Sequence, residues 1–129
     1  MFRNYLLAAS ISGFLAVGLS AFGAHALKEQ LSERLMSVYQ TAADYQFYHS
    51  LALLLVTVLA YQFPKARFLR LSARFFLAGI IIFSGSLYLL SLTGAGWLGA
   101  ITPVGGVSLM LGWLMLAIFA VRETSPEIS

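Results

Sequence analysis

Residues 75–92, FFLAGIIIFSGSLYLLSL, decide the fold, because they form a continuous apolar run without Asp, Glu, Lys or Arg. A helix needs about 20 predominantly apolar residues to cross the roughly 30 Å hydrocarbon core of a bilayer. Three further runs of this kind cover about residues 5–22, 47–63 and 101–121. None of the runs shows the period-two alternation of barrel strands, so the sequence predicts membrane-spanning helices.

The composition supports the same class. The chain has 129 residues, of which 60% are hydrophobic and 10% are charged, whereas soluble domains average about 25% charged residues. A soluble chain of about this size buries only about 70% of its surface, so the excess apolar surface must face lipid. We expect one all-α domain over residues 1–129. It is an integral membrane four-helix bundle with helices at about 5–24, 33–63, 70–93 and 102–121.

The basic residues predict the orientation. Four crossings place six of them on the side of the termini: Arg3, Lys65, Arg67, Arg70, Arg74 and Arg122. Lys28 and Arg34 lie on the opposite side, and the positive-inside rule then puts both termini in the cytoplasm. The loop from Lys65 to Arg74 is interpreted as an anchor against anionic headgroups, with no nucleic acid as partner. The lack of cysteine excludes disulfides and thiolate sites.

The first apolar run has a second interpretation. Arg3, an apolar middle and small residues near the end are also typical of a secretory signal peptide. Against cleavage, small residues recur along one helical face with spacings of four and three: Ala9, Gly13, Ala16, Ser20 and Gly23. Such a stripe lets another helix backbone approach closely in lipid, which favours a retained helix.

The segment between the first two runs predicts a short amphipathic helix on the outer surface. Leu27, Leu31 and Leu35 recur at helical spacing. Ser32 is a candidate N-cap for a long helix that Pro64 ends. The polar face of that helix is expected to be solvated and holds Glu33, Ser37, Gln40 and Asp44.

The last two runs carry further packing signals. Small residues form stripes on both predicted helices: Gly79, Ser86 and Thr93 on one, and Gly105, Ser108 and Gly112 on the other. Ser84 and Tyr88 lie on a neighbouring face. Thr102 is the predicted N-cap and Pro103 the first helical residue. Trp113 is expected near mid-membrane inside the bundle, where its indole N–H needs an acceptor such as a hydroxyl of residues 70–93. Glu123 and Glu127 are expected in a frayed tail.

Several separated motifs occur in a fixed order. They are Ala21-Phe22-Gly23-Ala24-His25-Ala26-Leu27, Tyr45-Gln46-Phe47-Tyr48-His49, Phe83-Ser84-Gly85-Ser86-Leu87-Tyr88, Thr102-Pro103-Val104-Gly105-Gly106 and Gly112-Trp113. Together they resemble the YgdD/YwdK-type family of small membrane proteins over nearly the whole chain. The resemblance implies four transmembrane helices and a bacterial inner (plasma) membrane location. It implies no established activity.

The candidate functional cluster consists of His25, Tyr45, Gln46 and His49. The two histidines lie at the outer ends of neighbouring helices, so their imidazoles are candidates to meet. An ionisable residue within a membrane span is a functional-site hypothesis, and histidine suits proton relay or pH sensing. The competing interpretation is that these side chains only bond between helices, with Tyr88 as a further partner.

The sequence predicts no catalytic, cofactor-binding or metal-binding residue. Zinc needs three or four ligands, and the chain offers two histidines. Paired-histidine haem ligation needs only two ligands, but nothing marks a porphyrin pocket, so no cofactor is predicted. The hypothesis for function is a structural or accessory membrane component, assembled as a homo-oligomer or within a larger membrane complex. The alternative is a proton-coupled or small-solute transporter or channel subunit that uses the region of His25 and His49, and an enzyme ranks third.

Overall fold

The computed structural model describes residues 2–124, and these residues are helical apart from short turns. The elements in chain order are α1 (Phe2–Phe22), the π-helical turn η1 (Gly23–Leu27), α2 (Glu33–Gln62), α3 (Arg67–Gly79), the π-helical turn η2 (Ile80–Ser84), α4 (Gly85–Thr93), the 3₁₀ turn η3 (Gly96–Ala100) and α5 (Thr102–Arg122). Because α3, η2 and α4 follow one another without a break, they form one long rod. The chain therefore forms the all-α, four-rod architecture that its apolar runs predict.

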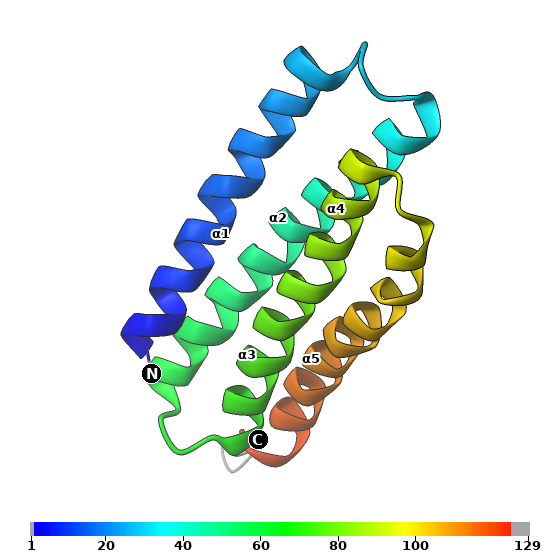
Figure 1. Cartoon of the computed structure of the whole chain (residues 1–129). Coiled ribbons are helices and arrows are strands. Elements are labelled where there is room, and N and C mark those ends of the chain that lie inside the picture. The colour runs from blue at the N-terminus through cyan, green and yellow to red at the C-terminus, as the bar shows by residue number, and fades with distance from the viewer. Residues whose placement is uncertain (1, 125–129) are drawn as a thin grey trace.

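Three rods are long and apolar enough to cross a membrane, namely Phe2–Leu27, Arg67–Thr93 and Gly96–Arg122. The rod α2 does not meet this criterion, because polar residues occupy its first half. Its crossing follows from connectivity: α1 ends at one end of the bundle and α3 begins at the other, so α2 must return the chain (Figure 1). We call the end with the N-terminus and Glu123 the termini end, and the opposite end the far end.

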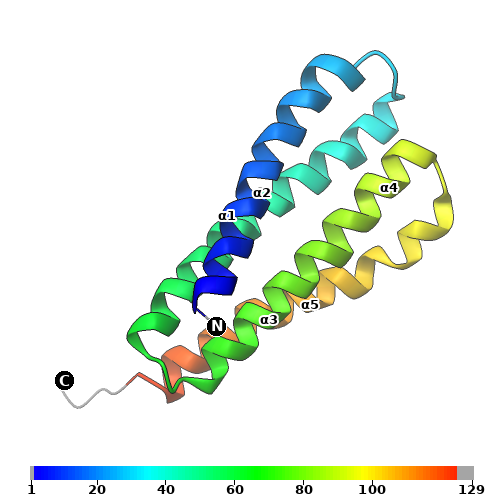
Figure 2. The same ribbon diagram turned by 60° about the vertical axis from the view of Figure 1, so that its left-hand side comes forward.

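The four rods do not form a closed square. Here α1 packs on α2, α2 packs on α3, η2 and α4, and α5 packs on α3 and η2. Figure 1 shows this order of neighbours with α1 and α5 as the outermost rods, and Figure 2 shows α1 lying in front of α2. One side of α1 and of α2 is consequently left uncovered by the rest of the chain.

Apolar side chains point outward over much of the surface. Phe14 is 78% exposed on α1, Met110 is 71% exposed on α5, and Val121 is 81% exposed near the end of α5. Soluble proteins do not expose so many large apolar side chains on every helix. This surface is the one that the composition assigned to lipid.

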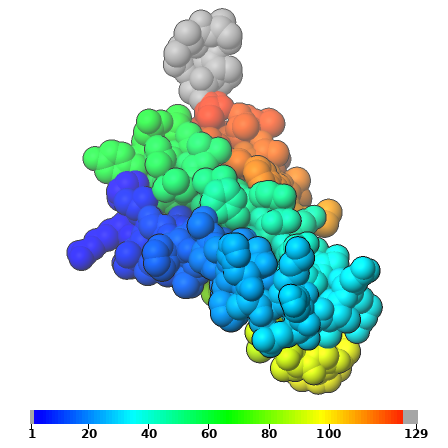
Figure 3. All heavy atoms as spheres, turned by 90° about the horizontal axis from the view of Figure 1, so that it is seen from above, coloured from blue at the N-terminus to red at the C-terminus, as the bar shows by residue number. Residues whose placement is uncertain are grey.

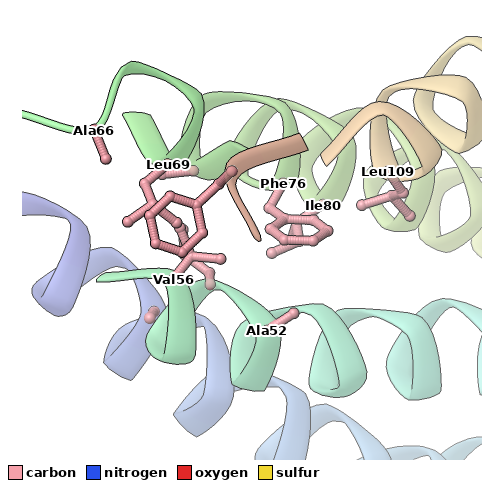
Figure 4. Packing of buried hydrophobic residues seen from close by; sticks show 11 residues of the cluster. Ala52, Val56, Ala66, Leu69, Phe76, Ile80 and Leu109 are labelled. Atoms are coloured by element: carbon pink, nitrogen blue, oxygen red, sulfur yellow. The ribbon is translucent and has the colours of Figure 1, made fainter. Parts of the chain in front are cut away.

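The buried apolar core lies where α2, α3 and α5 meet. Val56 from α2, together with Leu69 and Phe76 from α3, has no exposed surface. Figure 4 shows these side chains converging from facing helices, with Leu109 of α5 at the edge. α1 contributes Ala9 alone to the buried members of this cluster. The core therefore holds the last three rods together and leaves α1 attached through α2.

Glycines bring α5 close to the α3–η2 rod. A Cβ atom built on Gly105 would lie 2.6 Å from Cα of Phe83, and one on Gly112 would lie 2.5 Å from the ring of Phe76. At Gly79 the same atom would lie 2.5 Å from Leu109. Since real Cβ atoms do not approach so closely, glycine sets the spacing of these two helices.

The far end differs in two details from the expectation. Residues between α1 and α2 form the π-helical turn η1 and a bend, and no separate amphipathic helix is present there. After η1, the backbone N–H groups of Gln30 and Leu31 both bond to the carbonyl of Leu27 and close a turn. Ser32 then caps α2 as the sequence predicts, accepting a hydrogen bond from the Leu35 N–H at 3.1 Å.

The second difference concerns Thr102. The cap position of α5 is Ile101, and Thr102 is already the first helical residue. Its hydroxyl does not cap the helix but bonds to Ser86 of α4 at 2.6 Å and to the carbonyl of Leu98 at 3.3 Å. Pro103 remains within the first turn, where its missing N–H costs nothing.

The prediction that Glu123 lies in a frayed tail is wrong. Its two carboxylate oxygens accept hydrogen bonds of 2.9 Å from the backbone N–H groups of Arg67 and Phe68. These are free donors at the N-terminus of α3, where the helix dipole favours an anion. The end of α5 is therefore tied to the start of α3, while Glu127 lies outside the described residues.

Candidate functional site

Gln46 lies at the centre of a polar cluster that joins three rods. Its side-chain Nε2 donates to the Ser12 carbonyl of α1 at 3.1 Å, and its Oε1 accepts from the Tyr88 hydroxyl of α4 at 2.7 Å. A backbone carbonyl only accepts hydrogen bonds, so the amide nitrogen must face α1 and the oxygen must face α4. One amide thereby fixes α2 against both of its neighbours.

Serines extend this cluster along the α1–α2 contact. The Ser50 hydroxyl lies 2.7 Å from the Ser12 hydroxyl and 2.6 Å from the carbonyl of Gln46. Both serines are buried, and a Cβ atom built on the neighbouring Gly13 would lie 3.9 Å from Cβ of Ser50, which is ordinary van der Waals contact. Interhelical polar bonds in membranes average about 0.6 kcal/mol, so the group contributes modestly to stability but strongly to register.

His49 links α2 to α5, and its two bonds define its chemical state. Its Nδ1 lies 2.9 Å from the carbonyl oxygen of Tyr45, and its Nε2 lies 3.1 Å from the indole Nε1 of Trp113. The carbonyl can only accept and the indole can only donate. His49 is therefore the neutral tautomer with its proton on Nδ1, and a second proton on Nε2 would break the bond to Trp113.

Aromatic rings surround this histidine. Tyr45 stacks on it at 5.8 Å between ring centroids, and Phe76 of α3 lies 5.7 Å away. Trp113 meets Phe76 edge to face at 5.1 Å. The acceptor of the indole N–H is thus an imidazole of α2, where the sequence predicted a hydroxyl of residues 70–93. With 46% of its side chain exposed, Trp113 covers His49 at the lipid-facing surface rather than filling the interior.

The structure does not bring His25 to His49. Gly23 packs against Tyr39, whereas Ser12 bonds to Gln46, so α1 and α2 run antiparallel with His25 at the far end. At 1.5 Å per residue the two imidazoles are roughly 20 Å apart along the bundle. His25 is exposed in η1, and the candidate cluster therefore separates into a far-end histidine and a mid-bundle group.

The remaining predicted packing residues lie at helix contacts. Ser84 donates to the carbonyl of Ala42 at 2.8 Å and so ties η2 to α2. Ser86 joins α4 to the start of α5 through Thr102. A Cβ atom built on Gly106 would make only ordinary contact with the Phe83 ring, whereas one built on the neighbouring Gly105 would clash with the Phe83 backbone. These contacts place the hydroxyls and glycines at the interfaces between rods, where they do not line a path for a solute.

Two members of the polar cluster were missed from the sequence as cluster residues. Ser12 lies beside Gly13 of the small-residue stripe of α1 and was not counted in that stripe, and Ser50 directly follows His49. A serine in an apolar run is a weak signal, because its hydroxyl often bonds back to its own helix. Only the antiparallel register, which places Ser12 opposite Ser50, reveals their shared role.

The arrangement leaves few groups for chemistry. Within residues 2–124, no buried side-chain nitrogen or oxygen lacks a hydrogen-bond partner. No group of three or more His, Cys, Asp or Glu that could hold a metal ion occurs in that part of the chain. The polar atoms of the mid-bundle group are satisfied by hydrogen bonds between helices and to backbone carbonyls within α2.

Fold and site together define a small, multi-pass, all-helical membrane protein whose rods are joined by interhelical hydrogen bonds. A family model described as "Protein of unknown function (DUF423)" matches residues 19–106. The chain belongs to this family. No solved structure matches it.

Relatives match over nearly their whole length. The "UPF0382 membrane protein YwdK" of Bacillus subtilis is 40% identical over 120 residues, which is 93% of this chain and 98% of the relative. The "UPF0382 inner membrane protein YgdD" of Escherichia coli is 41% identical over 127 residues, or 98% of this chain and 96% of the relative. A "UPF0382 membrane protein" of Haemophilus influenzae is 38% identical over 125 residues, which is 97% of this chain and 99% of the relative. These names agree with a membrane protein whose biochemical function is unknown.

Proposed function

We propose that this protein is a structural or accessory component of the bacterial inner membrane, which acts by packing laterally against a second copy or another membrane protein. The observation that carries the proposal is the internal satisfaction of its polar groups. Gln46, His49 and their partners bond to one another and to backbone, so they hold rods together instead of facing a solute.

The inner-membrane location and orientation belong to the same proposal. The Escherichia coli relative is named an inner membrane protein. The termini end holds Arg67, Arg70 and Arg122, whereas the far end holds Lys28 and Arg34. The positive-inside rule then favours both termini in the cytoplasm.

The transporter alternative finds less support. A proton relay between His25 and His49 needs them to be close or joined by polar groups, but they lie roughly 20 Å apart along the bundle at 1.5 Å per residue. Both ring nitrogens of His49 are already bonded. A proton that enters at Nε2 must first displace the indole of Trp113, which makes His49 a poor carrier.

Two measurements on the same preparation test the proposal. Native mass spectrometry of the protein taken with its partners directly from its own membrane into nanodiscs should find the chain bound to a second copy or to a fixed partner protein, and recovery only as a lone monomer would contradict the proposal. Proteoliposomes loaded with a pH-sensitive dye should leak protons no faster than empty liposomes. A proton flux that His49→Ala or His25→Ala abolishes and that the control Glu33→Gln retains would refute the proposal in favour of transport.

A further inference from the structure

A groove runs along the uncovered face between α1 and α2. Its termini half has a volume of about 520 Å³ and is lined by small and apolar residues that include Gly13, Gly18 and Leu54. The next hollow, of about 210 Å³, shares Val17 and Phe47 with the first. Figure 3 shows α1 and the cyan part of α2 along one face with no other helix laid over them.

One carboxylate lies in this groove. Asp44 lines the hollow of about 210 Å³ together with Ala16, Phe47 and Tyr48. It also lines an adjoining hollow of about 180 Å³ toward the far end. Its carboxylate forms no hydrogen bond or ion pair with any residue in 2–124, and the side chain is exposed.

The depth of Asp44 makes this exposure unusual. It lies about 16 Å along α2 from Glu33, at 1.5 Å per residue. Ala42, two residues before Asp44 and about 3 Å from it along the helix axis, bonds through its carbonyl to Ser84, which belongs to the interior of the membrane-spanning rod Arg67–Thr93. Exposed apolar side chains such as Val17 lie at the same level. The sequence placed Asp44 on a solvated face, but the register places it beside the hydrocarbon region.

An unpaired charge at such a depth is costly, and intramembrane carboxylates normally pair or line a functional site. We propose that the α1–α2 groove binds a transmembrane helix of a partner protein, and that a Lys or Arg of this helix pairs with Asp44. Glycine and alanine along the groove let the partner backbone approach, while Asp44 sets its register. This inference rests on the proposed accessory function and names its partner class.

A second copy of the chain does not supply the missing cation. A two-fold dimer through this face would bring two Asp44 carboxylates together, and like charges in a low dielectric repel. Lys28 and Arg34 of a second copy lie toward the far end and not at the depth of Asp44. Arg74 lies on the termini side of the His49–Trp113 contact, so it would have to extend toward the membrane centre, opposite to the direction in which arginine snorkels. The charge complement must therefore come from another protein.

Designed peptides test the proposal with the full-length protein in phosphatidylcholine vesicles. A leucine-based transmembrane peptide carries one Arg at the depth of Asp44; one control has Leu there, and another has the Arg in the opposite leaflet. The chain has no cysteine, so Thr124→Cys provides a single labelling position for energy transfer. We expect the depth-matched Arg peptide to bind at least tenfold more tightly than either control.

Matched variants assign that difference to the groove. Asp44→Asn should abolish the preference for Arg, whereas Glu33→Gln, which removes a charge at the start of the same helix, should retain it. Gly18→Leu should block binding without unfolding the chain, because a Cβ at Gly18 meets nothing within 4 Å.

Equal binding of Arg and Leu peptides by the wild type would overturn the inference, as would a preference that survives Asp44→Asn. Energy transfer between two labelled copies of the chain that Gly18→Leu abolishes would also overturn it, since the groove would then hold a second copy. A proton flux measured in the same vesicles would refute the accessory function instead, so the two failures are distinguishable.

Discussion

Gly105→Ala should separate α5 from the α3–η2 rod. The new Cβ would lie 2.6 Å from Cα of Phe83, where carbon atoms normally pack at about 3.5–4.0 Å. The obstacle is backbone, so no side-chain rotation relieves it and the helices must move apart by about 1 Å. Overpacking of this kind costs about 1–3 kcal/mol, offset by up to about 1 kcal/mol from the better helix propensity of alanine. We expect a net loss of about 1–2 kcal/mol in the free energy of unfolding.

The adjacent glycine provides a matched control. A Cβ at Gly106 would lie 3.7 Å from the nearest ring carbons of Phe83, which is ordinary contact. Gly106→Ala should therefore leave stability unchanged or raise it by up to about 1 kcal/mol. Unfolding of both variants is measured by circular dichroism in mixed micelles. Equal stability of the two variants would refute the close approach of α5 to η2 of the α3–η2 rod.

Three further substitutions test the polar contacts. Trp113→Phe removes the donor to His49 and should lower the free energy of unfolding by about 0.6–1.7 kcal/mol in mixed micelles; no loss would mean that this bond is absent. Gln46→Leu leaves its partners on two rods unsatisfied, so it should cost about 1–3 kcal/mol in the same assay, and a gain in stability would contradict the cluster. Glu123→Gln weakens the cap of α3 by about 0.3–1 kcal/mol. Hydrogen exchange at the Phe68 amide should then accelerate, and unchanged exchange would disprove the cap.

Much of the fold follows from composition and helix signals. Apolar runs of near membrane length predict the four rods, and the glycine spacing of 101–121 predicts a close-packed face. Ser32 as a cap depends on local geometry alone, which a sequence carries. These features need no knowledge of which helix lies beside which.

The candidate site was harder to predict because it depends on register between helices. Spacing tells which face of α2 holds Gln46 and His49, but not which residue of another rod lies opposite. His25 was assigned to the same end of the bundle, whereas the packing of Gly23 on Tyr39 places it far from His49. Trp113 finds an imidazole as acceptor for the same reason.

The sequence also mispredicted the surroundings of two carboxylates, Glu123 and Asp44. Glu123 follows an apolar run and precedes a polar tail, so a solvated position was the simplest interpretation. The free N–H groups of α3 lie within its reach only because the bundle brings both ends together. For Asp44, a polar helix face indicated solvent, but the contact of its helix with Ser84 sets its depth.

The central claim is that the mid-bundle polar groups around Gln46 and His49 are committed to hydrogen bonds that hold the helices together. Nitrogen-15 NMR of the two histidines in bilayers tests this claim most directly, since the exposed His25 serves as an internal reference. His49 should remain the neutral tautomer with its proton on Nδ1 from pH 5.5 to 8, at shifts that Trp113→Phe alters. If His49 instead takes up a second proton across this range, as a proton carrier would, the account is contradicted.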